Sequence, residues 1–243
     1  MPKVKSKRRS GSEEVSVVKK SRTAERNSKA VIVNGCARDG HDSSDPKVLE
    51  QRRKQWFNKY AEGEEIGPEG VENFCYDLGV EPEDIVMLVI AWHMKAKRMG
   101  YFTRSEWMEG LQDLQCSKLD DLKRKLDSLR CELDNSTMFK DIYKYSYDFA
   151  KDKDQRSMDL ELAIGMLTLL LASRWNLHAD FITYLKEQGQ YKVINRDQWV
   201  NILEFSRTIS DDLLNYDING AWPVLLDEYV EWQKARNDGD STN

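Results

Sequence analysis

The stretch NRDQWVNILEFSRTISDDLLNYDINGAWPVLLDEYVEW, Asn195–Trp232, decides the fold class that the sequence predicts. Its apolar residues recur at helical spacing, which predicts two amphipathic helices over residues 196–209 and 221–234, joined by an acidic turn. Against only two basic residues, Arg196 and Arg207, it carries eight acidic ones: Asp197, Glu204, Asp211, Asp212, Asp217, Asp227, Glu228 and Glu231.

Aromatic residues are interleaved with these acids, namely Trp199, Phe205, Tyr216, Trp222, Tyr229 and Trp232. Acidic and aromatic residues together are typical of a surface that binds a basic partner, because apolar anchors supply affinity and carboxylates select the charge. The alternative is that the aromatic residues form core and the acids form a solvated face. The turn Gly220–Pro223 favours a partner site, because Ala221 is small and Pro223 suits a first helical turn.

The composition indicates one domain with tails. Of 243 residues 40% are hydrophobic and 33% charged, and a domain over residues 47–234 is long enough to bury a core. Residues 1–46 and 235–243 are predicted to be disordered tails. The longest apolar run, Met166–Ala172, is far shorter than the roughly 18 residues of a membrane helix, and the first ten residues are too polar for a signal peptide. No membrane partner is expected.

Charge is divided unevenly along the chain. Residues 1–46 carry eleven Lys/Arg and six Asp/Glu, a net +5, and the whole chain carries −5, so residues 47–243 carry −10. An acidic domain argues against nucleic acid as its ligand and favours a basic protein partner.

The basic residues of the tail form two clusters about ten residues apart, which is typical of a bipartite nuclear import signal. The pattern favours a nuclear location, with the cytoplasm also open, and the alternative is an ordinary solvated tail or a weak nucleic-acid contact. The residues are Lys3, Lys5, Lys7, Arg8, Arg9, Lys19, Lys20 and Arg22.

Helical spacing continues through the rest of the domain. We expect helices from residue 47 to Tyr60, from Pro68 to a stop at Gly79, from Pro82, and behind a Thr103–Glu106 capping box. Further expected helices follow the stripe Leu119, Leu122, Leu126, Leu129 and Leu133 and the segments Phe139–Phe149, Leu160–Ala172 and Asn176–Gln188. Extended segments are confined to two or three residues, such as Tyr101–Thr103 and Lys192–Ile194. The predicted fold is all-α, a bundle of about ten helices with calcium-free, hand-like helix–loop–helix pairs in its N-terminal half.

Metal sites find little support. A calcium loop beginning at Asp152 would offer Asp154 at its third position, but it has Arg156 at the fifth and Ala163 where a bidentate Glu is needed. The loop over residues 63–70 fails in the same way. The scattered histidines, and cysteines without a CxxC pair, also argue against zinc. We predict no metal and no cofactor, and keep a calcium-binding regulatory helical module as an alternative function.

Catalytic motifs are also missing from the sequence. It has no phosphate-binding glycine loop and no nucleophile elbow, and His93 lies in an apolar helix. Cys75 and Cys131 are expected in the core. A thioester-forming ligase that uses Cys116 or Cys131 is a third hypothesis, although neither has a visible activating group. We predict that the protein is not an enzyme.

Several long motifs occur in order along the chain. They are IGPEGVENFCYDLGVEP, MLVIAW, FTRSEWMEG and FAKDKDQRSMDLELA, followed by DQW, LEFSRT, NYD and GAWPVLLDEYVEW. Together they resemble the potentiating-neddylation domain of the defective-in-cullin-neddylation family, over residues 47 to 234. The basic leader is similar to that of the family's short nuclear branch.

The resemblance implies a non-catalytic scaffold, or co-ligase. Such proteins hold the C-terminal winged-helix domain of a cullin beside the neddylation conjugating enzyme, and the cullin RING subunit is a further candidate partner. They form no covalent bond with the modifier. The family's cullin surface is an acid–alanine–acid set, which matches Asp197, Ala221 and Asp227 here.

The family also has an apolar pocket for the acetylated N-terminal Met of the conjugating enzyme. Pro68, Met99 and Met166 stand where the best-known family pattern has an aliphatic residue, a glutamine and a tyrosine. Apolar side chains suit such a pocket, and the alternative is that the same residues are simply core. The matching positions here are Val71, Met87, Ile90, Phe102, Phe149 and Leu169.

Overall fold

The computed structural model describes residues 45–240, with side chains described as far as Asn237. These residues belong to one structural unit. Residues 1–44 of the predicted N-terminal tail, with all eight residues of the predicted import signal, lie outside the described residues. None of the described helices is long and apolar enough to span a membrane.

The N-terminal half is built from two helix–loop–helix pairs. The first is α1 (Pro46–Tyr60), β1 (Glu65–Ile66) and α2 (Pro68–Leu78), and the second is α3 (Ile85–His93), β2 (Phe102–Thr103) and α4 (Arg104–Asp113). The loops of the two pairs join as antiparallel strands, with Glu65 opposite Thr103 and Ile66 opposite Phe102. Both hydrogen bonds of the predicted Thr103–Glu106 capping box are present at the start of α4.

The C-terminal half repeats this plan, so hand-like pairs are not confined to the N-terminal half as the sequence analysis expected. It consists of α7 (Ser136–Ala150), β3 (Met158–Asp159) and α8 (Leu160–Leu171), then α9 (His178–Glu187), β4 (Val193–Ile194) and α10 (Arg196–Thr208). Met158 lies opposite Ile194, and Asp159 opposite Val193. The sequence analysis expected the extended segment Lys192–Ile194 but not its pairing with β3, because a two-residue strand carries no alternating pattern.

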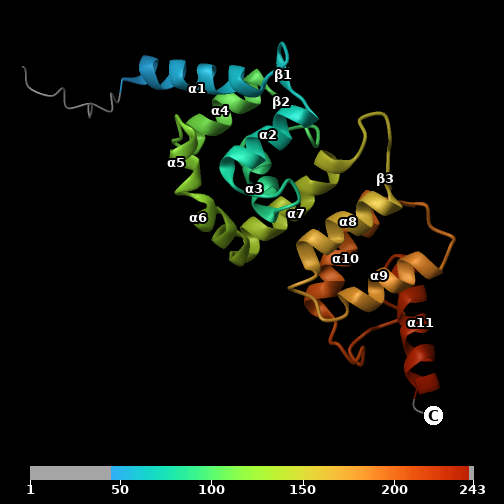
Figure 1. The fold of residues 1–243 in the computed structure, drawn as a ribbon. Coiled ribbons are helices and arrows are strands. Elements are labelled where there is room, and N and C mark those ends of the chain that lie inside the picture. The colour runs from blue at the N-terminus through green and yellow to red at the C-terminus, as the bar shows by residue number, and fades with distance from the viewer. Residues whose placement is uncertain (1–44, 241–243) are drawn as a thin grey trace, which may run out of the picture. The chain divides into compact units, whose positions relative to one another are not determined.

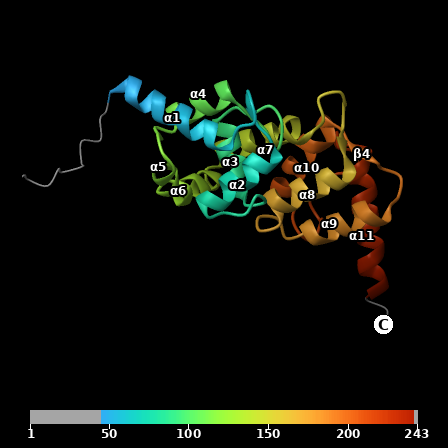
Figure 2. The ribbon, with the colours of Figure 1, turned by 45° about the horizontal axis from the view of Figure 1, so that its top comes forward.

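The described residues contain eleven α-helices and two two-stranded sheets, which confirms the all-α prediction. Figures 1 and 2 show α7 passing between the N-terminal helices and α8 and α10. α7 packs against α3 on one side and against α8 and α10 on the other, and the last helix, α11 (Val224–Asp240), packs on α9.

Three predicted helix limits are wrong. α3 begins at Ile85 rather than near Pro82, because the Asp84 carboxylate accepts a hydrogen bond from the Val86 amide and caps the helix there. α11 begins at Val224, after Pro223, and continues to Asp240, so much of the predicted C-terminal tail is helical.

The leucine stripe is not one helix. It is divided into α5 (Leu119–Lys123), α6 (Leu126–Cys131) and a 3-10 turn, η1 (Glu132–Asp134). The break falls at Arg124–Lys125, where the Lys125 ammonium reaches back 2.6 Å to the Leu114 carbonyl oxygen. The stripe still marks the buried face, since Leu122, Leu129 and Leu133 are buried.

Aromatic side chains fill the core of each half. In the N-terminal half Trp107 is completely buried and meets the rings of Trp56 and Phe74 edge-on, with centroids 5.0 and 5.1 Å away. In the C-terminal half Tyr143 of α7 stacks on Trp199 of α10 at 4.7 Å. The two residues also exchange hydrogen bonds of 2.9 Å, each side chain donating to the other's carbonyl oxygen.

We predict that Gly110→Ala destabilises the fold. A Cβ at Gly110 of α4 would lie 2.5 Å from the Cα and Cγ of buried Met94, so α4 would have to move away from the end of α3. The expected loss is about 1–3 kcal/mol in the free energy of unfolding, measured by urea denaturation.

The matched control is Gly165→Ala, which also adds one methyl group to a helix. A Cβ there meets nothing within 4 Å, so the greater helix propensity of alanine should add about 0.5–1 kcal/mol. Equal effects of the two substitutions would contradict the packing of α4 on α3.

Candidate functional site

The first predicted acid, Asp197, lies in the first turn of α10 and is exposed. Asn195 and Gln198 form a capping box that fixes the start of this helix. The Asp197 carboxylate accepts a hydrogen bond of 3.2 Å from the Asn201 amide, one turn further along.

The loop from α10 to α11, residues 209–223, is held by its own polar side chains. The side-chain oxygen of Asn215 accepts from the backbone N–H of Ser210 at 2.8 Å. The side-chain NH₂ of Asn215 donates to the Thr208 carbonyl oxygen at 2.7 Å. The Asp212 carboxylate accepts from the Leu214 amide at 3.1 Å. Leu213 adopts a left-handed backbone, with φ of 59°, and is buried. The loop therefore has one preferred conformation.

Two aromatic rings connect this loop to the helices. Trp222 stacks on Tyr216 at 6.0 Å, and both rings contact Phe205 of α10 at 5.8 Å. The Tyr216 hydroxyl donates to the Asp227 carboxylate of α11. Burial, with this hydrogen bond, raises the pKa of Tyr216, so the hydroxyl remains a donor. Ala221, which precedes Trp222, is exposed, and Asp227 is partly exposed.

Ala221 is thus next to Trp222 in the chain, and Asp227 is linked to the Tyr216–Trp222 stack through the Tyr216 hydroxyl. Asp197 lies further away, since it precedes Phe205 by eight residues, about 12 Å along the axis of α10. Asp197 therefore lies near the start of α10, Ala221 in the loop that follows this helix, and Asp227 in the first turn of α11.

The charges of this surface are not neutralised by the protein itself. Of the eight acidic residues in Asn195–Trp232, Glu204 alone forms an ion pair within the described part of the chain, with Lys140. The Glu228 carboxylate instead accepts from the hydroxyls of Tyr184 and Tyr191, at 3.2 and 2.8 Å. Asp197 and Asp227 keep their charge available to a partner.

A second candidate site is an apolar cavity of about 670 Å³, measured with its open mouth. It lies among α2, α3, α7, α8 and the segment that precedes β2. Five of the six predicted pocket residues line it; Ile90 does not, because it is completely buried in the core. The full lining is Val71, Pro82, Asp84, Met87, Leu88, Ala91, Met99, Gly100, Phe102, Phe149, Met166 and Leu169.

Sequence reasoning missed Leu88 and Ala91, although Ala91 follows Met87 at the four-residue spacing of one helix face. The difficulty is that α3 is apolar on all sides, so its pattern does not show which side faces the cavity. Met87, Met99 and Met166 provide a flexible, polarisable wall.

Asp84 is the one charged residue of the cavity lining. Burial alone would raise the pKa of Asp84, but hydrogen bonds from Arg130 and the Val86 amide, with the charge of Arg130, outweigh burial and lower it. The Arg130 guanidinium donates at 2.6 Å. Because this carboxylate is already paired, the cavity suits an uncharged apolar group.

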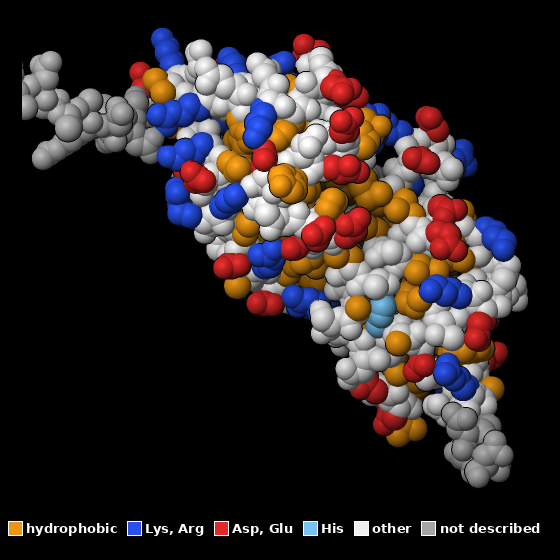
Figure 3. Space-filling model, viewed as in Figure 1, with side chains coloured by type: hydrophobic (Ala, Val, Ile, Leu, Met, Phe, Trp, Pro, Cys, Tyr) orange, Lys and Arg blue, Asp and Glu red, His pale blue; other side chains and the backbone are white. Residues whose placement is uncertain are grey.

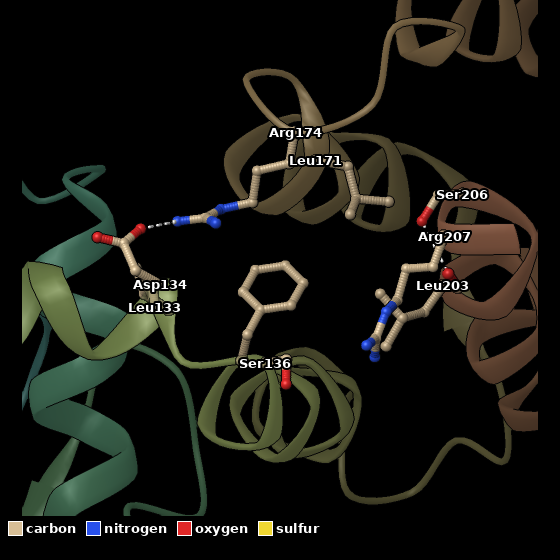
Figure 4. A pocket seen from close by; sticks show the side chains of 9 residues that line it. Leu133, Asp134, Ser136, Leu171, Arg174, Leu203, Ser206 and Arg207 are labelled. Carbon is tan, nitrogen blue, oxygen red and sulfur yellow. Dashed lines mark hydrogen bonds and ion pairs between the residues drawn. The ribbon is translucent and has the colours of Figure 1, made fainter. Parts of the chain in front are cut away.

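A cleft of about 530 Å³ lies between η1, α7, α8 and α10, where no site was predicted. Phe139 of α7 lines this cleft, and Figure 4 shows Arg174, which follows α8, and Arg207 of α10 on its wall. Arg174 stacks over the Phe139 ring at 4.9 Å and pairs with Asp134 at 3.2 Å. This cleft mixes apolar and basic groups and is separate from the acidic surface.

No described residues form a metal-binding cluster of three or more His, Cys, Asp or Glu side chains. In the loop after α7, the Lys151 ammonium donates to the carbonyl oxygens of Asp152 and Gln155. These two hydrogen bonds help to fix the conformation of the loop. The imidazole of His93, the histidine discussed above under catalytic motifs, is hydrogen-bonded to the Glu132 carboxylate at 2.8 Å.

The cysteines differ from expectation. Cys75 is buried as predicted, whereas Cys131 is exposed, because the last turn of α6 turns it outward. Cys116 is buried, and burial raises its pKa to about 11. A thiol in this environment is a poor nucleophile, which weighs against a thioester at Cys116.

We therefore predict that, in a Cys36→Ser background, a disulfide-forming thiol reagent at pH 8 labels Cys131 rapidly and Cys75 and Cys116 slowly. Burial raises the pKa of both slow thiols to about 11, so only about a thousandth of each is thiolate. Cys131→Ser should remove the fast phase. A fast phase that survives this substitution would contradict the burial of the other two thiols.

Comparison with known proteins assigns the family. A family model described as "Cullin binding" matches residues 121–232, which include all of α10 and the first part of α11. Human DCN1-like protein 5 is 56% identical over 182 residues, which cover 74% of this chain and 76% of that protein. Human DCN1-like protein 4 is 54% identical over 202 residues, which cover 81% of this chain and 69% of that protein. DCN1-like protein 4 of Drosophila melanogaster is 55% identical over 190 residues, which cover 77% of this chain and 76% of that protein. The chain belongs to the DCN1-like family and carries its cullin-binding domain.

Proposed function

We propose that this protein promotes the neddylation of cullins as a scaffold without a catalytic residue of its own. The surface of Asp197, Ala221 and Asp227 binds the winged-helix domain at the C-terminus of a cullin. The apolar cavity receives the acetylated N-terminal Met of the neddylation conjugating enzyme. The observation that carries the proposal is the acidic surface of α10 and α11, where one of eight acids has an internal ion-pair partner among the described residues.

Electrostatics supports a basic partner at this surface. Unpaired carboxylates raise the local concentration of a basic domain and orient it during encounter. Ala221 lets the partner's backbone approach between them, and the aromatic residues beneath are held by their own stacking. Few side chains have to be ordered on binding, which keeps the entropic cost small.

The cavity supports an acetylated terminus rather than a free one. A free N-terminal ammonium would enter an apolar lining whose one carboxylate, Asp84, already pairs with Arg130. Burying an unpaired charge is costly, and acetylation removes that charge. The methionine side chain then finds the apolar surface of Met87, Met166 and Leu169.

The proposed mechanism is proximity: the protein holds both partners close together. When both partners are bound, transfer of the modifier becomes effectively intramolecular, and tethering of this kind raises apparent affinity by roughly 10²–10⁴. The cullin RING subunit would be a neighbour in such a complex. We also propose that the basic clusters of residues 3–22 direct the protein to the nucleus.

Reversing charge on the acidic surface should abolish cullin binding. Asp197→Arg and Asp227→Lys are each expected to weaken binding of a cullin C-terminal domain at least about thirtyfold, because like charges across an interface cost several kcal/mol. Titration calorimetry measures the affinity, and circular dichroism checks the fold.

The matched control is Glu161→Arg, which reverses an exposed acid in the first turn of α8. It should bind the cullin domain as the wild type does. Unchanged binding by both Asp variants would remove the assignment of this surface.

Acetylation should decide binding to the cavity. We expect an N-terminal peptide of the conjugating enzyme to bind at least about tenfold more tightly when its Met is acetylated, because the free ammonium has no partner there. Fluorescence anisotropy with matched labelled peptides measures the ratio.

Leu169→Arg, at a partly exposed lining position, should abolish peptide binding and leave cullin binding intact. Asp227→Lys should do the reverse. If the two peptides bind equally tightly, the cavity does not recognise the acetylated terminus.

A further inference from the structure

Exposed aliphatic side chains gather in the loop between α10 and α11. Seven large hydrophobic residues are exposed in the described part of the chain, and three of them fall within residues 214–224. They are Leu214, Ile218 and Val224, with exposed fractions of 86%, 62% and 64%. Figure 3 shows apolar surface bordered by acidic side chains where Figure 1 places this loop.

The loop presents these side chains in a fixed conformation. Leu213 points inward and is buried, and the amide of Leu214 is held by the Asp212 carboxylate, so Leu214 is directed outward. The Asp217 carboxylate similarly accepts from the Asn219 amide at 2.9 Å, which shapes the turn that carries Ile218. Apolar side chains held outward on an ordered turn are a preformed contact rather than the by-product of a loose loop.

The charge around the apolar residues defines the partner. Asp211, Asp212 and Asp217 flank them, and none forms an ion pair with another described residue. A partner that covers Leu214 and Ile218 must therefore bring Lys or Arg beside its own apolar side chains. A second copy of this acidic domain fits poorly, because its carboxylates would face these.

The same loop continues into the proposed cullin surface. Tyr216, between Leu214 and Ile218, donates to Asp227 and stacks on Trp222, the neighbour of Ala221. Leu214 and Ile218 therefore lie on the same loop as Ala221, and this loop is linked to Asp227 through Tyr216.

We propose that Leu214 and Ile218 are apolar contact residues that extend the cullin-binding surface onto this loop and give it affinity that does not depend on charge. The occupant is the basic cullin domain, through an aliphatic or aromatic side chain that lies beside its lysines or arginines. The inference rests on the proposed function. In this proposal the carboxylates speed the association of the basic cullin domain, and Leu214 and Ile218 slow its dissociation.

The test compares the double variant Leu214→Ser/Ile218→Ser with wild type, using the full chain and a cullin C-terminal winged-helix domain in surface plasmon resonance. Both side chains are exposed, so the fold should be unaffected, as thermal denaturation will check. We expect affinity to fall about tenfold or more, through faster dissociation. The slope of affinity against salt concentration should stay as in the wild type, whereas Asp227→Asn should reduce that slope.

Tyr76→Ser is the matched control, because Tyr76 is equally exposed, at 85%, but lies on α2. It should bind as the wild type does. Wild-type affinity in the double variant, with Asp227→Lys inactive, would overturn this inference and leave the proposed function standing. Failure of the wild type to bind the cullin domain would overturn both. Loss of self-association in the double variant, seen by sedimentation velocity, would show that a second copy covers the loop and would overturn the proposal.

Discussion

Two tyrosine hydroxyls on α7 hold the two halves of the domain in register. Tyr143 donates to the Trp199 carbonyl oxygen of α10, at 2.9 Å, and Tyr145 donates to the Ala96 carbonyl oxygen after α3, at 2.8 Å. Two residues apart on a helix point to nearly opposite sides, so one helix is tied to both halves at once. Burial raises the pKa of both tyrosines, which keeps the hydroxyls as donors.

This constraint matters because each candidate site lies against α7 or one of its partners. Phe149 of α7 stacks on Tyr145 and lines the apolar cavity, while Trp199 of α10 follows Asp197 by two residues. The cavity and the acidic surface are therefore fixed relative to each other by buried polar contacts. A scaffold that works by orientation needs such a fixed spacing, since a small misplacement of reacting groups costs much of the rate.

Most of the helices could be predicted from the sequence, because apolar spacing, capping residues and glycine stops are local signals. The Thr103–Glu106 box and the stop at Gly79 are examples that the structure confirms. The features that could not be predicted from the sequence depend on tertiary contacts. Ile90 and Ala91 are neighbours on an all-apolar helix, and only packing decides that Ala91 lines the cavity. The break at Lys125 likewise depends on a carbonyl eleven residues away.

In each half of the domain the loops hold the helix–loop–helix pairs together. In each half two loops join through a two-residue antiparallel ladder, which ties helices that are distant in sequence. The loop after α7 uses the Lys151 ammonium on its carbonyl oxygens, so an internal cation serves acceptors that would otherwise need a partner. The spacing between the cavity and α10 then follows from these ladders together with the hydrogen bonds of Tyr143 and Tyr145 on α7.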